Sequence, residues 1–373
     1  MALQSRILIL SAQSSRSTSA YTYRLLSLAR LLEDRGYNCD YFFMEDHPPL
    51  DTETTRSVFM PLWLRKMRSY DLIYCGAAEA AQAFFFSKPF MPGIVMIDMH
   101  GDIVSQSAQT KFLMTGGKKN SPSFRVWLIY KMAMMISDYC ITQSTYQMED
   151  LISEGVTAGN VSVVRNGVDL DMFEFTDLPK DPEFSIGYVG TFHTWQGTEY
   201  LFEAIGLMKN RQARILLIGF DEEDGWKKEF AAAYGDRVET LNKMDRPKLI
   251  EKMKSVHTLM SPRPPHIASR AAFPTKFAEY ASLGRPILVT DVDETAEYVQ
   301  KYECGFVCKA TSTDLAHAMD LAVETPRDRL VKMGRNARKM AETNFSWPII
   351  GDDYAGLVDR LLARRSPKKR VVP

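Results

Sequence analysis

Residues 260–291, MSPRPPHIASRAAFPTKFAEYASLGRPILVTD, decide the fold of this chain. The stretch begins as the end of a strand, continues as a loop with two arginines, and enters a helix at FPT that runs through KFAEYASL. Pro274 stands where the first helical turn tolerates a missing N–H group, and Gly284 ends the helix before a buried strand. This order predicts one strand–helix–strand unit, with polar residues gathered at the helix start.

The start of this predicted helix suits an anion. The first N–H groups of a helix have no partner within it and carry partial positive charge, so they bind phosphate. Lys276, Arg270 and Arg263 lie close by in the sequence. Glu279 lies about one turn beyond Thr275, and its carboxylate can accept hydrogen bonds from sugar or ribose hydroxyls. We therefore expect a site for a diphosphate and a ribose here.

The run PTKFAEYASLGRPIL, residues 274–288, resembles the P-x-K-x-x-E-Y-x-x-x-G-x-P signature of retaining glycosyltransferases of family 4, group 1 type, which have the GT-B fold. That family transfers sugars from nucleoside diphosphate sugars. The resemblance implies that Glu279 binds the donor's ribose and that the helix start, with Thr275, Lys276 and Phe277, holds its diphosphate. The alternative is an amphipathic helix whose lysine and glutamate are merely solvated.

Length and composition predict an ordinary globular protein. The 373 residues suggest about two domains of roughly 150 to 200 residues each. Lysine plus arginine and aspartate plus glutamate each number 46, so the zero net charge gives no sign of a nucleic-acid partner. The five cysteines are odd in number and widely spaced, which is typical of reduced thiols in a cytoplasmic protein. We recognise no signal peptide and no membrane-spanning run.

The first part of the chain predicts a βαβ start, with strands at residues 5–11 and 38–43 and a helix at residues 24–36. No GxGxxG fingerprint follows the first strand, so a dehydrogenase is disfavoured. His100 follows the later strand IVMID in the context V-x-x-D-x-H-G. This context resembles the family's strand whose histidine contacts the transferred sugar, which implies a catalytic role for His100. The alternative is a structural histidine that caps the sheet.

The helix expected at residues 123–137 is apolar nearly all round, so we interpret it first as a core helix. The second interpretation is an interfacial surface, because aromatic residues alternate with lysines and arginines from residue 111 onward. Such clusters favour anionic membranes, and the basic run at residues 364–370 would add to the attraction. Peripheral contact with the inner face of a membrane is thus the second interpretation of this region.

Further along, the resemblance extends over a strand, a helix opened by Ser144 or Thr145, and an NGVD turn. It implies two Rossmann-like β/α/β domains that face across a cleft. The first covers residues 1–176, the second covers 177–345, and a closing helix at 346–362 returns to the first domain.

In the second domain, Gly190 and Thr191 fall at the end of the strand SIGYVGTF, where the resemblance places the donor's diphosphate. Lys243 and Met244 match the place where relatives hold the nucleotide base through backbone groups. Three positions depart from the family pattern. Thr191 and Gln196 stand where relatives carry an arginine and a lysine, and Ala271 replaces the first of two glutamates.

The implied reaction moves a hexose from a UDP- or GDP-sugar to a hydroxyl of a glycan, lipid-linked or small-molecule acceptor, with retention. His100, Lys276 and Glu279 would act in catalysis. The donor is a co-substrate, and no other cofactor is expected. No metal is expected either, because enzymes of the fold that the resemblance implies usually need none, and the DVDE run at 291–294 follows the wrong strand for a metal-binding D-x-D. The rival functions are a nucleotide-sugar epimerase of the same architecture and a non-catalytic nucleotide-sugar binder.

Overall fold

The computed structural model describes residues 5–17, 20–46, 67–81, 85, 88–100, 104, 107, 121–192, 196–221 and 225–364. The chain divides into two compact units, Met1–Arg165 with Trp347–Pro373, and Asn166–Ser346. The chain first crosses between the units after Arg165, whereas the sequence predicts the crossing after residue 176. Each unit contains a six-stranded sheet in which every pairing is parallel. The prediction of two Rossmann-like sheets is confirmed.

The sheet of the first unit has the order β2-β1-β3-β4-β5-β6. Its strands are β1 Arg6–Ser11, β2 Asn38–Phe43, β3 Leu72–Cys75, β4 Ile94–Met99, β5 Tyr139–Thr142 and β6 Val161–Val163. Alternate residues of strand β1, which lies between β2 and β3, enter two different cores. Ile7 and Ile9 face one side and Leu8 and Leu10 the other, so both faces of this sheet need a cover of helices.

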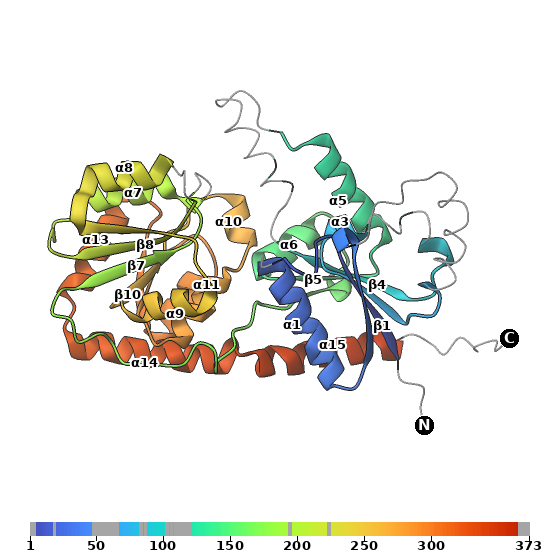
Figure 1. The fold of residues 1–373 in the computed structure, drawn as a ribbon. Coiled ribbons are helices and arrows are strands. Elements are labelled where there is room, and N and C mark those ends of the chain that lie inside the picture. The colour runs from blue at the N-terminus through green and yellow to red at the C-terminus, as the bar shows by residue number, and fades with distance from the viewer. Residues whose placement is uncertain are drawn as a thin grey trace. The chain divides into compact units, whose positions relative to one another are not determined.

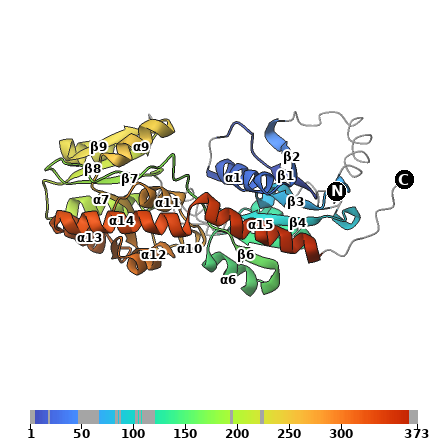
Figure 2. The ribbon, with the colours of Figure 1, turned by 90° about the horizontal axis from the view of Figure 1, so that it is seen from below.

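Helices cover both faces of this first sheet. They are α1 Ala20–Asp34, α3 Ala78–Ala81, α5 Phe124–Ile136, α6 Thr145–Ser153 and α15 Trp347–Arg364. Helix α15, red in Figures 1 and 2, lies beside the blue helix α1 from the other end of the chain. The indole of Trp347 donates a hydrogen bond to the hydroxyl of Tyr23 at 3.2 Å. The closing helix therefore completes one core of the first unit.

The sheet of the second unit has the order β12-β11-β10-β7-β8-β9. Its strands are β7 Ser185–Val189, β8 Arg214–Phe220, β9 Val238–Asn242, β10 Thr258–Ser261, β11 Ile287–Thr290 and β12 Gly305–Cys308. Strand β7 pairs with both β8 and β10. Because these strands are parallel, the loops that follow them share one edge of the sheet, the edge where such sheets bind ligands.

Two cores also flank this second sheet. Its helices are α7 Thr198–Leu207, α8 Gly225–Tyr234, α9 Arg246–Lys254, α10 Ile267–Ala271, α11 Thr275–Ser282, α12 Thr295–Tyr302, α13 Ser312–Glu324 and α14 Arg327–Asn344. Figure 1 shows α7 and α8 on one side of the sheet and α9 and α11 on the other. Helix α11 begins and ends as predicted, and Gly284 just beyond it has a φ of 74°, which suits glycine. The short helix α10 lies where the sequence suggested only a loop.

Across the described ranges, no helix combines the length and the apolar character needed to cross a membrane.

Candidate functional site

Tyr280 fastens helix α11 to the end of strand β7. Its hydroxyl accepts a hydrogen bond from the N–H of Val189 at 3.1 Å and donates one to the carbonyl of the same residue at 3.2 Å. The side chain is buried, and burial raises the pKa of Tyr280 well above its usual value, so the hydroxyl keeps its proton. Helix α11 is thus fixed beside the carboxyl end of β7.

The backbone at that end of β7 is closely packed. Gly190 donates its N–H to the carbonyl of Ile218 at 3.0 Å. Gly219 has a φ of 125°, and a Cβ atom there would lie 2.0 Å from the carbonyl oxygen of Gly190. Only glycine therefore fits at 219. Gly190 and Thr191 lie directly after β7, at the sheet edge where ligands of such folds bind.

Glu279 is the most constrained charged residue of α11. Its side chain is only 6% exposed, and its two oxygens face two different cations. Oε2 lies 2.9 Å from Nζ of Lys276, and Oε1 lies 3.0 Å from Nη2 of Arg246. The structure thus brings together the predicted Lys276 and Glu279. The alternative of a merely solvated glutamate does not fit a side chain that is buried and paired with two cations.

Arg246, the second cation at Glu279, is not indicated by the sequence. It is the first residue of α9 and lies two positions beyond Met244. The run RPKLIEKMKSV predicts a helix, but nothing in it indicates a partner 33 residues away. The proximity to the predicted base-binding residues was the only available signal.

The other two residues predicted at the start of α11 have different surroundings. Thr275 is the first residue of the helix and is half-buried, so its N–H belongs to the turn whose donors lack partners within the helix. Phe277 is fully buried, and its ring packs against Phe273 and Phe345 with ring centroids 5.8 Å away in each case. Its N–H donates to the carbonyl of Pro274 at 3.1 Å. The side chain of Phe277 therefore belongs to the core and cannot contact a donor.

Arg263 does not offer an unpaired cation, contrary to the expectation that it balances a diphosphate. Its Nη1 lies 3.0 Å from Oδ2 of Asp293 and donates to the carbonyl of Ala272 at 2.8 Å. Burial raises the pKa of Asp293, and the neighbouring Arg263 partly offsets that rise. The pair braces the loop after β10. Arg270 lies on α10 with an exposed side chain.

Asp293 comes from the DVDE run, and besides this ion pair its Oδ1 accepts from the N–H and the hydroxyl of Thr295 at 2.9 and 2.5 Å. Within the part of the chain that the structure describes, no three histidine, cysteine, aspartate or glutamate side chains gather as a metal site would require.

Lys243 and Met244 follow strand β9, as expected for the base-binding turn. The ammonium group of Lys243 pairs with exposed Asp221 at 2.6 Å, and its N–H donates to the carbonyl of Phe220 at 3.0 Å. Met244 packs against the buried core. The backbone N–H of Lys243 is therefore already used, which leaves its carbonyl and the backbone of Met244 for the predicted contact.

His100 lies in the first unit, at the end of β4, over a buried ionic network. Its Nδ1 lies 2.7 Å from Nε2 of Gln143, and its Nε2 lies 3.4 Å from Oδ2 of Asp98. The ring centroid is 5.0 Å from that of Tyr21. The side chain is 17% exposed, and its buried Nε2 makes no hydrogen bond with any residue that the structure describes, so Gln143 holds the ring through one nitrogen only.

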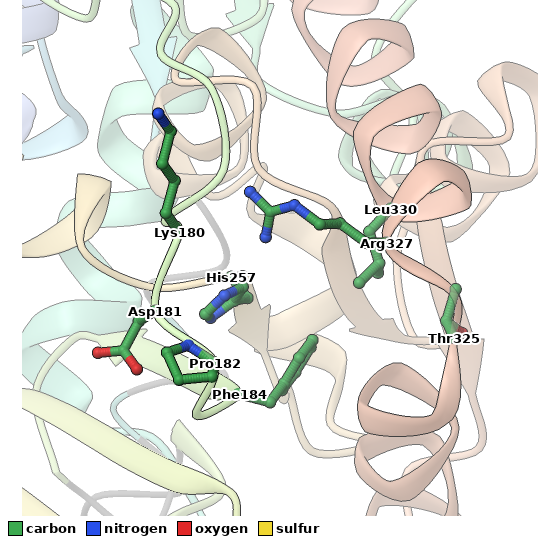
Figure 3. Close-up of a pocket in the computed structure, with 8 residues that line it drawn as sticks. All are labelled: Lys180, Asp181, Pro182, Phe184, His257, Thr325, Arg327 and Leu330. Atoms are coloured by element: carbon green, nitrogen blue, oxygen red, sulfur yellow. The ribbon is translucent and has the colours of Figure 1, made fainter.

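The second unit also contains a cavity of about 430 Å³, shown in Figure 3. Phe184 and His257, stacked with centroids 5.0 Å apart, directly precede β7 and β10, so the cavity lies at the opposite edge of the sheet. Arg327 points toward His257 in Figure 3 and donates to the carbonyls of Leu178 and Pro179 at 3.0 and 2.8 Å. These hydrogen bonds hold the segment that leads into β7 against the start of α14. We therefore interpret the cavity as a structural feature and not as a ligand site.

Comparisons with known proteins point to one group. Residues 171–340 match the family model described as glycosyl transferases group 1, which covers most of the second unit. The D-inositol 3-phosphate glycosyltransferase of Gordonia bronchialis is 25% identical over 234 residues, which are 57% of this chain. The match spans 50% of that relative, so the chain covers about half the length of the curated relative it matches.

Solved structures extend the likeness to the first unit. Sucrose-phosphate synthase from Thermosynechococcus elongatus superposes with a TM-score of 0.75 at 18% identity, over 97% of this chain and 100% of that one. HepE from Anabaena, determined in complex with UDP-glucose, gives a TM-score of 0.70 at 17% identity, over 95% and 99%. A glycosyltransferase from Rickettsia africae gives 0.73 at 14% identity, over 98% and 100%. At these identities the likeness establishes the GT-B fold, as predicted.

Proposed function

We propose that this chain moves a hexose from a nucleoside diphosphate sugar to a hydroxyl group of a glycan, lipid-linked or small-molecule acceptor, with retention at the anomeric carbon. The match of residues 171–340 to the group 1 glycosyltransferases supports the transferase class. The likeness to HepE, which is described with UDP-glucose, supports a UDP-sugar as the first donor to test and a GDP-sugar as the second.

The observation that carries the proposal is the placement of Glu279. Its buried carboxylate lies on α11, which Tyr280 fixes beside the end of β7, and the first turn of the same helix carries Lys276. A carboxylate that accepts hydrogen bonds from a ribose diol, on the same helix as a lysine and the N–H groups of the first turn, matches the chemistry of a nucleoside diphosphate.

In this mechanism the leaving diphosphate gathers negative charge as the glycosidic bond breaks. The N–H dipoles at the start of α11 and the ammonium group of Lys276 would stabilise that charge, because fixed dipoles need no reorganisation during the reaction. Backbone groups at Lys243 and Met244 would hold the base, and Gly190 and Thr191 the diphosphate. We also propose that His100 contacts the transferred sugar through Nε2, while Nδ1 keeps its contact with Gln143.

A lipid-linked acceptor would suit a peripheral membrane contact, and α5 supports one. One face of α5 packs into the core through Ile129, Tyr130, Ala133 and Ile136. Its outer face exposes Phe124, Trp127, Leu128 and Met135 by 73%, 42%, 40% and 75%, at helical spacing. Exposed Arg125 and Lys131 lie on the same helix. The lysines expected to complete this cluster, from residue 111 to 119, and the tail 365–370 lie outside the described residues.

The test is turnover of UDP-, GDP- and ADP-hexoses over a panel of glycan and lipid-linked acceptors. We expect release of nucleoside diphosphate that depends on acceptor, and a product with the donor's anomeric configuration. Lys276→Ala and Glu279→Ala should each lower this turnover while keeping the wild-type circular dichroism. Epimerised donor formed without acceptor would indicate the epimerase, and binding without turnover would indicate the non-catalytic binder.

A further inference from the structure

We propose that Arg246 is a positioning residue that makes the site selective for ribose, by holding the carboxylate of Glu279 in place while a nucleotide binds. The inference rests on the proposed function, because it assigns the ribose of the donor to Glu279. Arg246 acts through Glu279 and touches neither the transferred sugar nor the reacting bond.

Each carboxylate oxygen of Glu279 contacts a different cation. Lys276 lies on the same helix, three residues earlier, and pairs with Oε2 at 2.9 Å. Arg246 comes from a different helix and pairs with Oε1 at 3.0 Å. A carboxylate accepts about four hydrogen bonds, so both cations leave acceptor sites for the two hydroxyls of a ribose.

The two cations differ in how freely their side chains can move when a nucleotide binds. Their exposure is similar, 31% for Lys276 and 36% for Arg246, but the flexible side chain of Lys276 at the helix start would turn toward the arriving diphosphate. Its hold on Glu279 then weakens. Arg246 has a planar guanidinium that lies 5.5 Å from the ring centroid of buried Phe173, so its orientation is restricted. Arg246 is thus the cation that continues to fix the carboxylate in the nucleotide complex.

The position of Arg246 also connects two parts of the site. It opens α9, two residues after Met244, so the turn assigned to the base leads directly into the residue that orients the ribose anchor. Glu279 is 6% exposed, and a buried carboxylate without its partner is poorly compensated. Without Arg246 we expect the side chain of Glu279 to move toward Lys276 or water and to lose its alignment with the ribose.

The test compares a ribonucleotide with its 2′-deoxy analogue, since only the 2′-hydroxyl differs. Calorimetric titration of the wild-type protein with UDP and dUDP, or with the matching pair for whichever base binds, should show about ten- to a hundredfold tighter binding of the ribonucleotide. Arg246→Met should bind both nucleotides with nearly equal affinity, and Arg246→Lys should restore part of the preference. Glu279→Gln should resemble Arg246→Met.

Lys248→Met is the matched control, because Lys248 lies on the same helix in an exposed pair with Asp245, 3.6 Å apart. It should keep the wild-type preference. A purely structural role for Arg246 would lower the melting temperature of Arg246→Met and leave the ratio of the two affinities unchanged, which would overturn the inference. Wild-type binding without any preference for ribose would also overturn it. No binding of any nucleotide by the wild-type protein would instead reject the proposed function itself.

Discussion

The guanidinium of Arg24 and the carboxylate of Asp98 form a buried ion pair, with Nε 2.8 Å from Oδ2 and side chains only 1% and 0% exposed. Arg24 lies on α1 and Asp98 on β4. The arginine also donates to the carbonyls of Val164 and Arg165 at 2.7 and 3.0 Å, and Tyr74 donates to Asp98 at 2.6 Å. The pair therefore connects a helix, a central strand and the end of the first unit.

We expect Asp98→Asn to be strongly destabilising, because it leaves the charge of Arg24 buried without its counter-ion. Breaking one side of a buried pair costs about 3 to 5 kcal/mol. Urea unfolding followed by circular dichroism measures the loss. Asp40→Asn is the control, since the pair of Asp40 with Arg6 is 42% and 40% exposed, and it should cost less than about 1 kcal/mol. Equal losses in the two variants would contradict this account.

The same pair predicts a dependence of stability on pH. Burial alone would raise the pKa of Asp98, but the charges of Arg24 and His100 outweigh it and hold that pKa well below its usual value. A depressed folded-state pKa stabilises the protein above the unfolded value of about 4, and the contribution is lost as the pH falls below it. The stability difference between wild type and Asp98→Asn should therefore shrink between about pH 5 and pH 2. A difference that stays constant over this range would exclude the pair as its source.

Gly219→Ala should lower the free energy of unfolding by more than the strain of its positive φ alone explains. A methyl group there meets the carbonyl of Gly190, whereas Gly155, with a similar φ of 104°, has nothing within 4 Å of an added Cβ. Gly155→Ala should thus cost only the conformational strain of about 1 to 2 kcal/mol, and Gly219→Ala clearly more. The unfolding free energies of the two variants give the comparison. Similar values would mean that the clash relaxes freely.

The sequence predicts the regular structure of this chain well because the signals are local. The apolar run of β1 and the proline and glycine that bound α11 lie within the elements that they specify. The hydrophobic pattern of α5 predicts a helix, but it cannot say that Phe124 and Met135 stay exposed, since that depends on which other elements the helix meets.

The candidate site was only partly predictable for the same reason. Glu279 and Lys276 are three residues apart on one helix, so their signature is readable. The partners of Glu279 and Arg263 on other elements, Arg246 and Asp293, are 33 and 30 residues away along the chain. Pairings at such separations leave no periodic pattern in a single sequence, and only the fold reveals which cations are already neutralised.

Trp127→Gln tests the exposed face of α5. If that face contacts membranes, the variant should bind phosphatidylglycerol vesicles several-fold more weakly than wild type in a sedimentation assay, and added salt should weaken both. Leu321→Gln replaces a residue that is 46% exposed on α13 and should have no effect. Vesicle binding that is unchanged in Trp127→Gln would contradict the membrane contact. If the wild-type protein is a dimer and Trp127→Gln is a monomer, the face binds a second copy of the chain instead.

The central claim is that Glu279 anchors the ribose of a nucleoside diphosphate, and calorimetric titration of wild type, Glu279→Ala and Glu297→Ala with UDP, GDP and ADP tests it most directly. Glu297 is an exposed glutamate on α12 and serves as the control. We predict that wild type and Glu297→Ala bind one nucleotide equally well. Glu279→Ala should bind it at least about tenfold more weakly, because a hydrogen bond to a charged group is lost. Undiminished binding by a folded Glu279→Ala, or no nucleotide binding by the wild type, would contradict the account.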